Sequence, residues 1–423
     1  MAAMSSGRVF VDSPAPAERL GRGLLGPGIF VGVAVVVANA LNAAFQIALA
    51  RILDPAEYSL LVALVVITLI AAVPPLAFQA AVAREVAVAL DDERPGDAGA
   101  ALRGTVRALV PWALAILALG GLAYPVLDAL GRGDAGATFA TAGTISAALV
   151  IPAVWGGLQG ARLFLVLGLA HLTFAGTRLG AGLGIGLAGG GAAAVMGGVA
   201  AATAVTLLLT MLPLRGLWRA SVRSGARRLA TLPNAAAATG LTLLTALASV
   251  DVLVAKLAFP SATAGAYGVA SVGARVLLLV PIGVTTVLFP RVAVLRDRSR
   301  ERRHLLAGLG VVALLGAITT AVLWACSDFL VGHVFGHKYA AAGPWLGPLS
   351  LAMALYALAT VYMYHFLSLA RARFALVLVG IFVAQLAAFA ALHGRPANLI
   401  GVQIAAAAVT LATAEAWYLA RHR

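Results

Sequence analysis

The stretch GIFVGVAVVVANALNAAFQIALA, residues 28–50, decides the class of this chain. It contains no charged residue, and as a helix rising 1.5 Å per residue it is long enough to cross the roughly 30 Å hydrocarbon core of a bilayer. Backbone groups in lipid must satisfy their own hydrogen bonds, which a helix does within one segment. Residues 28–50 therefore predict a membrane-spanning helix.

Similar apolar runs recur along the whole chain, separated by charged or Pro/Gly-containing breaks. Of the 423 residues, 62% are hydrophobic and 11% are charged, whereas soluble domains contain about 45–50% apolar and about 25% charged residues. We place spans at about residues 28–50, 59–79, 108–129, 136–158, 163–186, 192–213, 234–258, 266–289, 306–330, 344–367, 374–392 and 398–418. The predicted fold is an all-α integral membrane protein of about twelve transmembrane helices.

The basic residues indicate the topology. Most of the 30 arginines and lysines fall on one side of the membrane if both termini are cytoplasmic, as the positive-inside rule requires. The remaining ones are Arg51, Arg132, Arg178, Lys256, Lys338 and Arg395 outside, and Arg275 within a span. The arginines cluster in short connections and not on a soluble basic domain, so we expect no nucleic-acid partner despite a net charge of +14. Membrane lipids are the expected contacts of these clusters.

A repeated spacing suggests two related halves. Pro74 and Arg84 are separated by the same interval as Pro281 and Arg291. Halves of six spans each share one orientation, as in transporters whose site lies between parallel repeats. We expect a cytoplasmic N-terminal segment (1–27), a six-helix lobe (28–213), a basic cytoplasmic linker (214–233) and a second six-helix lobe (234–423). The longest connections, about 84–107, 214–233 and 290–305, are too short for an independent soluble domain.

Two features bear on cofactors. Cys326 is the only cysteine, so an intrachain disulfide and a cysteine-based metal site are excluded, and we expect it to be a buried, small apolar residue. The glycine cluster at 189–191 follows no predicted strand and precedes no phosphate-loop lysine, which argues against a nucleotide site. We predict neither a cofactor nor a metal.

Two stretches resemble a known family. One is ALARILDPAEY at residues 48–58, between the first two spans; the other comprises SVDVLVAK (249–256), AGAY (264–267) and LFPR (288–291). They are similar to the openings of the two lobes of polysaccharide flippases, whose superfamily also contains multidrug and toxic compound extrusion transporters and flippases of lipid-linked peptidoglycan precursors. The resemblance implies two six-helix lobes around a central cavity. It also implies movement of a polyprenyl-diphosphate-linked oligosaccharide across a bacterial cytoplasmic membrane by alternating access, and no enzymatic activity.

Two ionisable residues lie within predicted spans of the second lobe. Arg275 is about nine residues, roughly 14 Å, and Asp251 about seven residues, roughly 10 Å, from the adjoining ends of antiparallel spans, so we expect an ion pair. One hypothesis is that Arg275 binds a substrate phosphate through paired hydrogen bonds while Asp251 holds or releases it. The other is that the pair neutralises itself and fixes the helix register.

The first lobe contains two polar helix faces. Asn39, Asn42 and Gln46 share one face of the first span by their spacing of three and four residues. They predict either hydrogen bonding between packed helices or a polar cavity wall for sugar hydroxyls. His171 and Arg178, seven residues apart, share a face of the fifth span, where Arg178 either lines the cavity or extends to the interface.

Alternative functions remain open at this stage. A cation-coupled exporter of small amphiphilic compounds would use a buried carboxylate without a basic partner, so the expected pairing of Asp251 with Arg275 argues against it. Asp251 and Glu415 are the candidate coupling residues for a proton or sodium ion. A membrane glycosyltransferase or polymerase of the same glycan pathway is a third interpretation. Glycan-assembly enzymes are candidate partners, which the arginine run at 291–303 would contact at the cytoplasmic face.

Overall fold

The computed structural model describes residues 16–129, 134–220, 233–281, 298–368 and 374–420, and within these ranges the chain is helical and contains no strand. Twelve segments of the described residues are long and apolar enough to cross a membrane, which confirms the twelve predicted spans. The helices of the first half are α1 (Pro16–Ile52), α2 (Pro55–Ala71), α3 (Leu76–Asp91), α4 (Pro95–Ala129), α5 (Ala135–Gly160), α6 (Phe164–Leu187), α7 (Ala192–Met211), η1 (Leu212–Leu214) and α8 (Arg215–Arg219). Those of the second half are α9 (Pro233–Leu247), α10 (Val250–Ala258), α11 (Ser261–Ala274), η2 (Arg275–Leu279), α13 (Arg298–Ala325), α14 (Ser327–Leu330), η3 (Val331–Phe335), η4 (His337–Ala342), α15 (Gly343–Ser368), α16 (Phe374–Leu392) and α17 (Pro396–Ala420).

Carboxylates begin several helices at the end of the molecule where α1 ends. Asp54 caps α2 by accepting a hydrogen bond from the Glu57 amide at 2.9 Å, ahead of a proline in the first turn. Asp134 caps α5 in the same way through the amide of Ala137. The Glu57 carboxylate accepts from the amide of Ala192, the first residue of α7, at 2.5 Å. These contacts satisfy amide groups that a helix leaves unpaired at its start.

The second span is longer than we predicted. Pro74 and Pro75 interrupt it between α2 and α3, since proline supplies no amide hydrogen. Beyond this break the chain stays helical to Asp91, and α4 already begins at Pro95, so most of the expected connection at 84–107 is helix. The apolar residues of α3 explain the extension, because Val82 and Val86 are buried in a cluster with residues of α5.

One further expectation from the sequence is wrong, and two others fall partly outside the described residues. Cys326 is exposed and not buried, because it lies at the junction of α13 and α14, outside the packed core. In the arginine run at 291–303, Arg291 and Arg296 lie outside the described residues, and the other four arginines lie in the first turns of α13. The expected segments 1–27 and 214–233 are described only in part.

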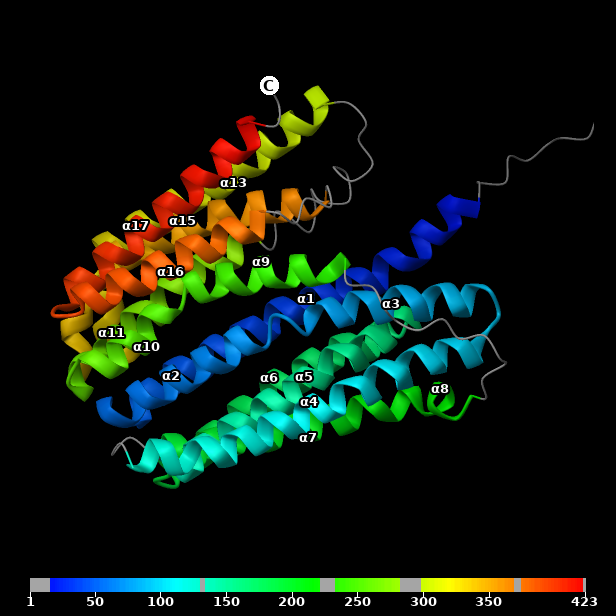
Figure 1. The fold of residues 1–423 in the computed structure, drawn as a ribbon, viewed down its shortest axis with the longest axis horizontal. Coiled ribbons are helices and arrows are strands. Elements are labelled where there is room, and N and C mark those ends of the chain that lie inside the picture. The colour runs from blue at the N-terminus through cyan, green and yellow to red at the C-terminus, as the bar shows by residue number, and fades with distance from the viewer. Residues whose placement is uncertain (1–15, 130–133, 221–232, 282–297, 369–373, 421–423) are drawn as a thin grey trace, which may run out of the picture.

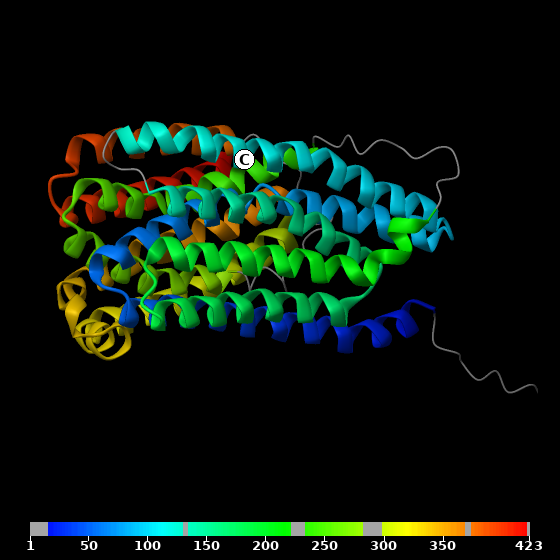
Figure 2. The same cartoon turned by 90° about the horizontal axis from the view of Figure 1, so that it is seen from below.

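The helices form two groups. We call residues 16–220 the N-terminal half and residues 233–420 the C-terminal half. In the first, α1 packs on α6, and α5 on α3, α4 and α7; in the second, α15 packs on α11, α13 and α17, and α16 on α9 and α17. Figure 1 shows the two groups as separate layers, with α2 between them, and Figure 2 shows the helices running roughly along one direction. α2 contacts α5 and α7 of its own half and α9, α10 and α11 of the other.

The two halves meet at the end of the molecule where α2 and α11 begin, which we call the converging end. Lys256 donates from Nζ to Ser59 Oγ at 2.7 Å, and the rings of Tyr58 and Tyr339 lie 5.6 Å apart. Figure 1 shows the groups diverging toward the opposite end, where α3 and α8 lie far from α13. Contact between the halves is therefore concentrated at one end.

Gly265 allows this close approach. A Cβ atom at Gly265 would lie 2.6 Å from the carbonyl oxygen of Pro55, whereas one at Gly268, a turn further along α11, would meet Val62 at an ordinary 3.6 Å. We expect Gly265→Ala to lower the free energy of unfolding by about 1–3 kcal/mol, because backbone atoms must shift to admit the methyl group. Thermal unfolding of the purified protein in detergent measures this effect.

The matched control for this substitution is Gly268→Ala. Both changes add the same helix propensity, so only the contact with Pro55 differs. Equal stabilities of the two variants would show that the Gly265 contact does not hold the halves together.

Candidate functional site

A buried charged cluster lies between α10 and α11. The carboxylate of Asp251 is fully buried and accepts a hydrogen bond from the hydroxyl of Tyr267 at 2.9 Å. Arg275 Nη2 lies 3.8 Å from Asp251 Oδ1 and donates to the carbonyl of Ser249 at 3.4 Å. Arg275 Nε and Asp251 Oδ1 have no hydrogen-bond partner within the described part of the chain. The structure thus brings the predicted pair together with hydrogen-bonding capacity left over.

Arg275 lies deeper than the sequence suggested. Because α11 begins at Ser261, Arg275 is about 21 Å from the start of its helix at 1.5 Å per residue, instead of the roughly 14 Å that we expected. It nevertheless reaches Asp251, since helical side chains tilt toward the N-terminus of their helix. Regular α-helix ends at Ala274, and the chain continues from Arg275 as the tighter η2.

A helix interruption forms the second part of this cluster. α9 ends at Leu247 and α10 begins at Val250, so Ala248 and Ser249 break the seventh span. In a continuous helix the carbonyl of Leu247 would accept from the amide four residues on. It accepts instead from the side-chain amides of Gln385, at 3.1 Å, and Gln403, at 2.9 Å.

These two glutamines were not among the predicted site residues. Both are buried, Gln385 on α16 and Gln403 on α17, and Gln385 also donates to Gln403 at 2.7 Å. The available signal was an isolated amide in each of the last two apolar spans, since such amides commonly join transmembrane helices. Together with Asp251 and Arg275 they place several donors and acceptors beside one broken helix.

In the N-terminal half the two predicted polar faces meet. Arg178 of α6 donates from Nη1 to Asn42 Oδ1 of α1 at 3.2 Å, and its guanidinium carbon lies 4.4 Å from the centre of the Phe45 ring. The Asn42 amide group in turn donates to the carbonyl of Ala38 at 3.0 Å. Arg178 is therefore partly buried against α1, in a cation–π arrangement, and its Nε has no partner among the described residues.

Within the described ranges, the other candidate residues of this half, Asn39, Gln46 and His171, make no hydrogen bond with Arg178 or Asn42. Gln46 Oε1 is buried and unpartnered within the described residues, and Asn39 is partly buried on α1. His171 donates from Nδ1 to Leu167 at 2.9 Å, if that nitrogen carries the proton, and its ring lies 4.2 Å from that of Trp155. His171 thus packs within the bundle.

Glu415 belongs to a different environment from Asp251. It is partly buried on α17 and accepts a hydrogen bond from the hydroxyl of Tyr362 on α15. The two candidate coupling carboxylates consequently have separate partners. Among the described residues no three His, Cys, Asp or Glu side chains gather as they would around a metal ion.

A similar arrangement of two groups of membrane-spanning helices occurs in solved structures of MOP superfamily transporters. No protein-family model and no curated protein matches the chain. Solved structures do: lipid II flippase MurJ in an inward closed conformation has a TM-score of 0.66 at 12% identity, covering 91% of this chain and 86% of that one. A multidrug resistance MATE family transporter in an inward-facing conformation has a TM-score of 0.65 at 11% identity, covering 90% and 95%. One in an outward-facing conformation has a TM-score of 0.55 at 12% identity, covering 93% and 95%. At these identities the likeness shows the fold.

The buried pair makes a testable contribution to stability. We expect Arg275→Gln to lower the free energy of unfolding by about 3 kcal/mol, because it leaves the buried carboxylate of Asp251 without its cation. Adding Asp251→Asn removes that charge as well, so the double variant should recover most of the loss. A double-mutant cycle compares the thermal unfolding of wild type, Arg275→Gln, Asp251→Asn and the double variant. A purely additive cycle would contradict an electrostatic pair.

Proposed function

We propose that this protein is a membrane transporter that flips a polyprenyl-diphosphate-linked oligosaccharide from the inner to the outer leaflet for assembly of a cell-surface polysaccharide. The observation that carries the proposal is the MOP-type arrangement of two helix groups, in contact at one end and apart at the other. The moving units are the two lobes, residues 28–213 and 234–423, on either side of a central cavity. Transport follows from alternating contact at the two ends.

The state of the molecule supports this mechanism. The TM-score is 0.65 with a MATE transporter facing inward and 0.55 with one facing outward. Under the positive-inside assignment, the converging end faces the outside of the cell and the diverging end faces the cytoplasm. Both observations support an inward-facing state, and the location that we propose is a bacterial cytoplasmic membrane with both termini in the cytoplasm.

The substrate class rests on the resemblance of residues 48–58 and 249–291 to polysaccharide flippases, and on the shared fold with a lipid II flippase. Arg275 is the residue that we assign to the substrate phosphate, because its Nε is unpaired and a planar guanidinium matches phosphate oxygens. Asn39, Asn42, Gln46, His171 and Arg178 are the assigned residues of the N-terminal lobe. Glycan-assembly enzymes are the proposed partners.

A cation-coupled exporter of small amphiphilic compounds is the second candidate function. The observation that favours it is the fully buried carboxylate of Asp251, since such groups take part in proton and ion transfer. Asp251 already interacts with Arg275 and Tyr267, and this leaves Glu415 as the other candidate for a coupling proton or sodium ion. The shared transporter fold favours both over a glycosyltransferase or polymerase.

Depletion of the protein in its host tests the proposed substrate. We expect a polyprenyl-diphosphate-linked oligosaccharide to accumulate in the inner leaflet, and wild-type protein to clear it. Arg275→Gln should clear it at least about tenfold more slowly, because a lost charge-assisted hydrogen bond costs about 1.5–3 kcal/mol. The measurement is the amount of lipid-linked oligosaccharide extracted from membranes at equal protein abundance.

Two further variants separate binding from structure. Arg395→Gln removes an exposed cation far from Arg275 in the chain and should behave as wild type. The double variant Asp251→Asn/Arg275→Gln, which restores the buried charge balance, should still fail if Arg275 binds the phosphate. Full transport by the double variant would assign the pair a structural role, and unchanged lipid pools on depletion would favour small-compound export.

A further inference from the structure

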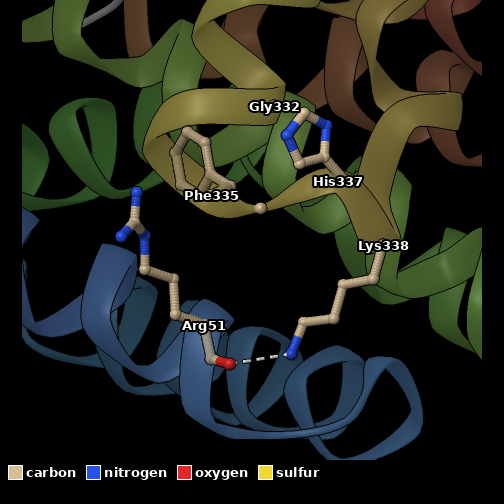
Figure 3. A pocket seen from close by; sticks show the side chains of 6 residues that line it. Arg51, Gly332, Phe335, His337 and Lys338 are labelled. Carbon is tan, nitrogen blue, oxygen red and sulfur yellow. Dashed lines mark hydrogen bonds between the residues drawn. The ribbon is translucent and has the colours of Figure 1, made fainter.

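A second site, which contains none of the residues assigned to transport, lies at the converging end. It is a pocket of about 390 Å³ between α1 and the segment from η3 to η4 (Figure 3). The N-terminal half contributes Arg51, in the last turn of α1. The residues from the C-terminal half are Gly332, Phe335, Gly336, His337 and Lys338.

Each half supplies a cation that hydrogen-bonds the backbone of the other. Arg51 donates from Nε to the carbonyl of Val334 at 2.8 Å and from Nη2 to that of His333. Lys338 donates from Nζ to the carbonyls of Arg51, at 3.0 Å, and Leu53, at 2.5 Å. These carbonyls lie at or next to the last turns of α1 and η3, where the helix dipole favours cations. Figure 3 shows the pocket between the two side chains.

The two cations keep their charges in this arrangement, because carbonyl oxygens are neutral. Across the described residues neither takes part in a salt bridge. Three carboxylates of this end bind helix starts and keep their charges too: Asp54 caps α2 and interacts electrostatically with Lys338, Glu57 caps α7, and Asp328 lies in the first turn of α14. None of these carboxylates lines the pocket, whose lining contains two cations, Arg51 and Lys338.

Unused donors are also present. Within the described part of the chain, Arg51 Nη1 makes no hydrogen bond, and the His337 side chain contacts the ring of His333 at 6.0 Å without bonding the N-terminal half. Guanidinium, imidazole and ammonium groups around one opening are the usual ligands of phosphate oxygens. A volume near 390 Å³ falls among small-molecule sites of about 300–1,000 Å³, so a diphosphate fits.

We propose that this pocket binds an anion of the phosphate class, held by Arg51, His337 and Lys338. Because the ligands come from both halves, the complete site exists only while the halves are together at this end. By linkage, the anion stabilises the arrangement in which the converging end is closed. Anion binding stands apart from the flippase assignment, whereas its effect on transport rests on that proposed function.

The test uses the full-length protein in nanodiscs of neutral phosphatidylcholine, with inorganic pyrophosphate as the probe. Isothermal titration calorimetry should give saturable binding of one pyrophosphate per chain. Lys338→Gln should weaken it at least about tenfold, since it removes one charge-assisted contact. Arg395→Gln, the same change at an exposed cation outside the pocket, should leave the affinity unchanged. No binding by wild type, or equal losses in both variants, would overturn the proposal.

A third variant tests whether Lys338→Gln weakens binding only because it breaks hydrogen bonds between the two halves. His337→Ala removes a pocket ligand while leaving the hydrogen bonds of Arg51 and Lys338 in place. Weaker binding by this variant supports direct coordination, and wild-type affinity excludes His337 from the site. Replacing phosphatidylcholine by phosphatidylglycerol identifies the source of the anion: a lipid headgroup competes with pyrophosphate, whereas a soluble anion binds alike in both discs.

Spin-label distances test the link to closure. In a Cys326→Ala background, cysteines at the exposed positions Ala188 and Gly394 place one label on each half. Pyrophosphate should narrow the distance distribution toward its shorter component in wild type and not in Lys338→Gln. Binding without any change in distance would overturn the linkage. These readouts involve no lipid-linked oligosaccharide, so a failed flippase assay and a failed anion site are distinguishable.

Discussion

A backbone carbonyl within a membrane cannot remain without a hydrogen-bond donor, and this requirement organises the C-terminal half. The break between α9 and α10 frees the carbonyl of Leu247, which then binds Gln385 and Gln403. The carbonyl of Ser249 in the same break accepts from Arg275. One interruption thereby joins α9 and α10 to α16, α17 and the end of α11, and it places the buried carboxylate of Asp251 beside a cation.

Apolar contacts hold the helices together within each half and also join the two halves. The larger of the two buried apolar clusters contains residues of both halves, whereas side-chain pairs such as Asn42 with Arg178 lie within one half. Between the halves, polar contacts at the converging end run from cations to carbonyls or to a hydroxyl, with a glycine allowing the backbones to approach. Such contacts bury little charge, and water can replace them when the halves separate. Opening this end in the proposed transport cycle therefore exposes apolar groups as well as these polar contacts.

The sequence predicted the spans well because a bilayer demands about 20 apolar residues per helix. It also predicted that Asp251 and Arg275 approach each other, since adjoining antiparallel spans fix their relative depth. It did not predict the break at Ala248 and Ser249, because neither residue is a proline or glycine. The partners Gln385 and Gln403 depend on that break, so they were missed too. Arg51 and Lys338 were interpreted only as topology signals. Their contacts could not be predicted, because they join residues almost 290 positions apart in the sequence.

The distance along the chain between the broken helix and its partners has a consequence for biosynthesis. Gln385 and Gln403 follow Leu247 by 138 and 156 residues. At a synthesis rate of about 5–20 residues per second, the ribosome needs roughly 7–30 s to deliver the first of them. During that interval the carbonyl of Leu247 can be satisfied only by water, by the insertion machinery or by the amide of Asp251 in an unbroken helix. The broken form of the seventh span is therefore completed only after α16 and α17 have been made.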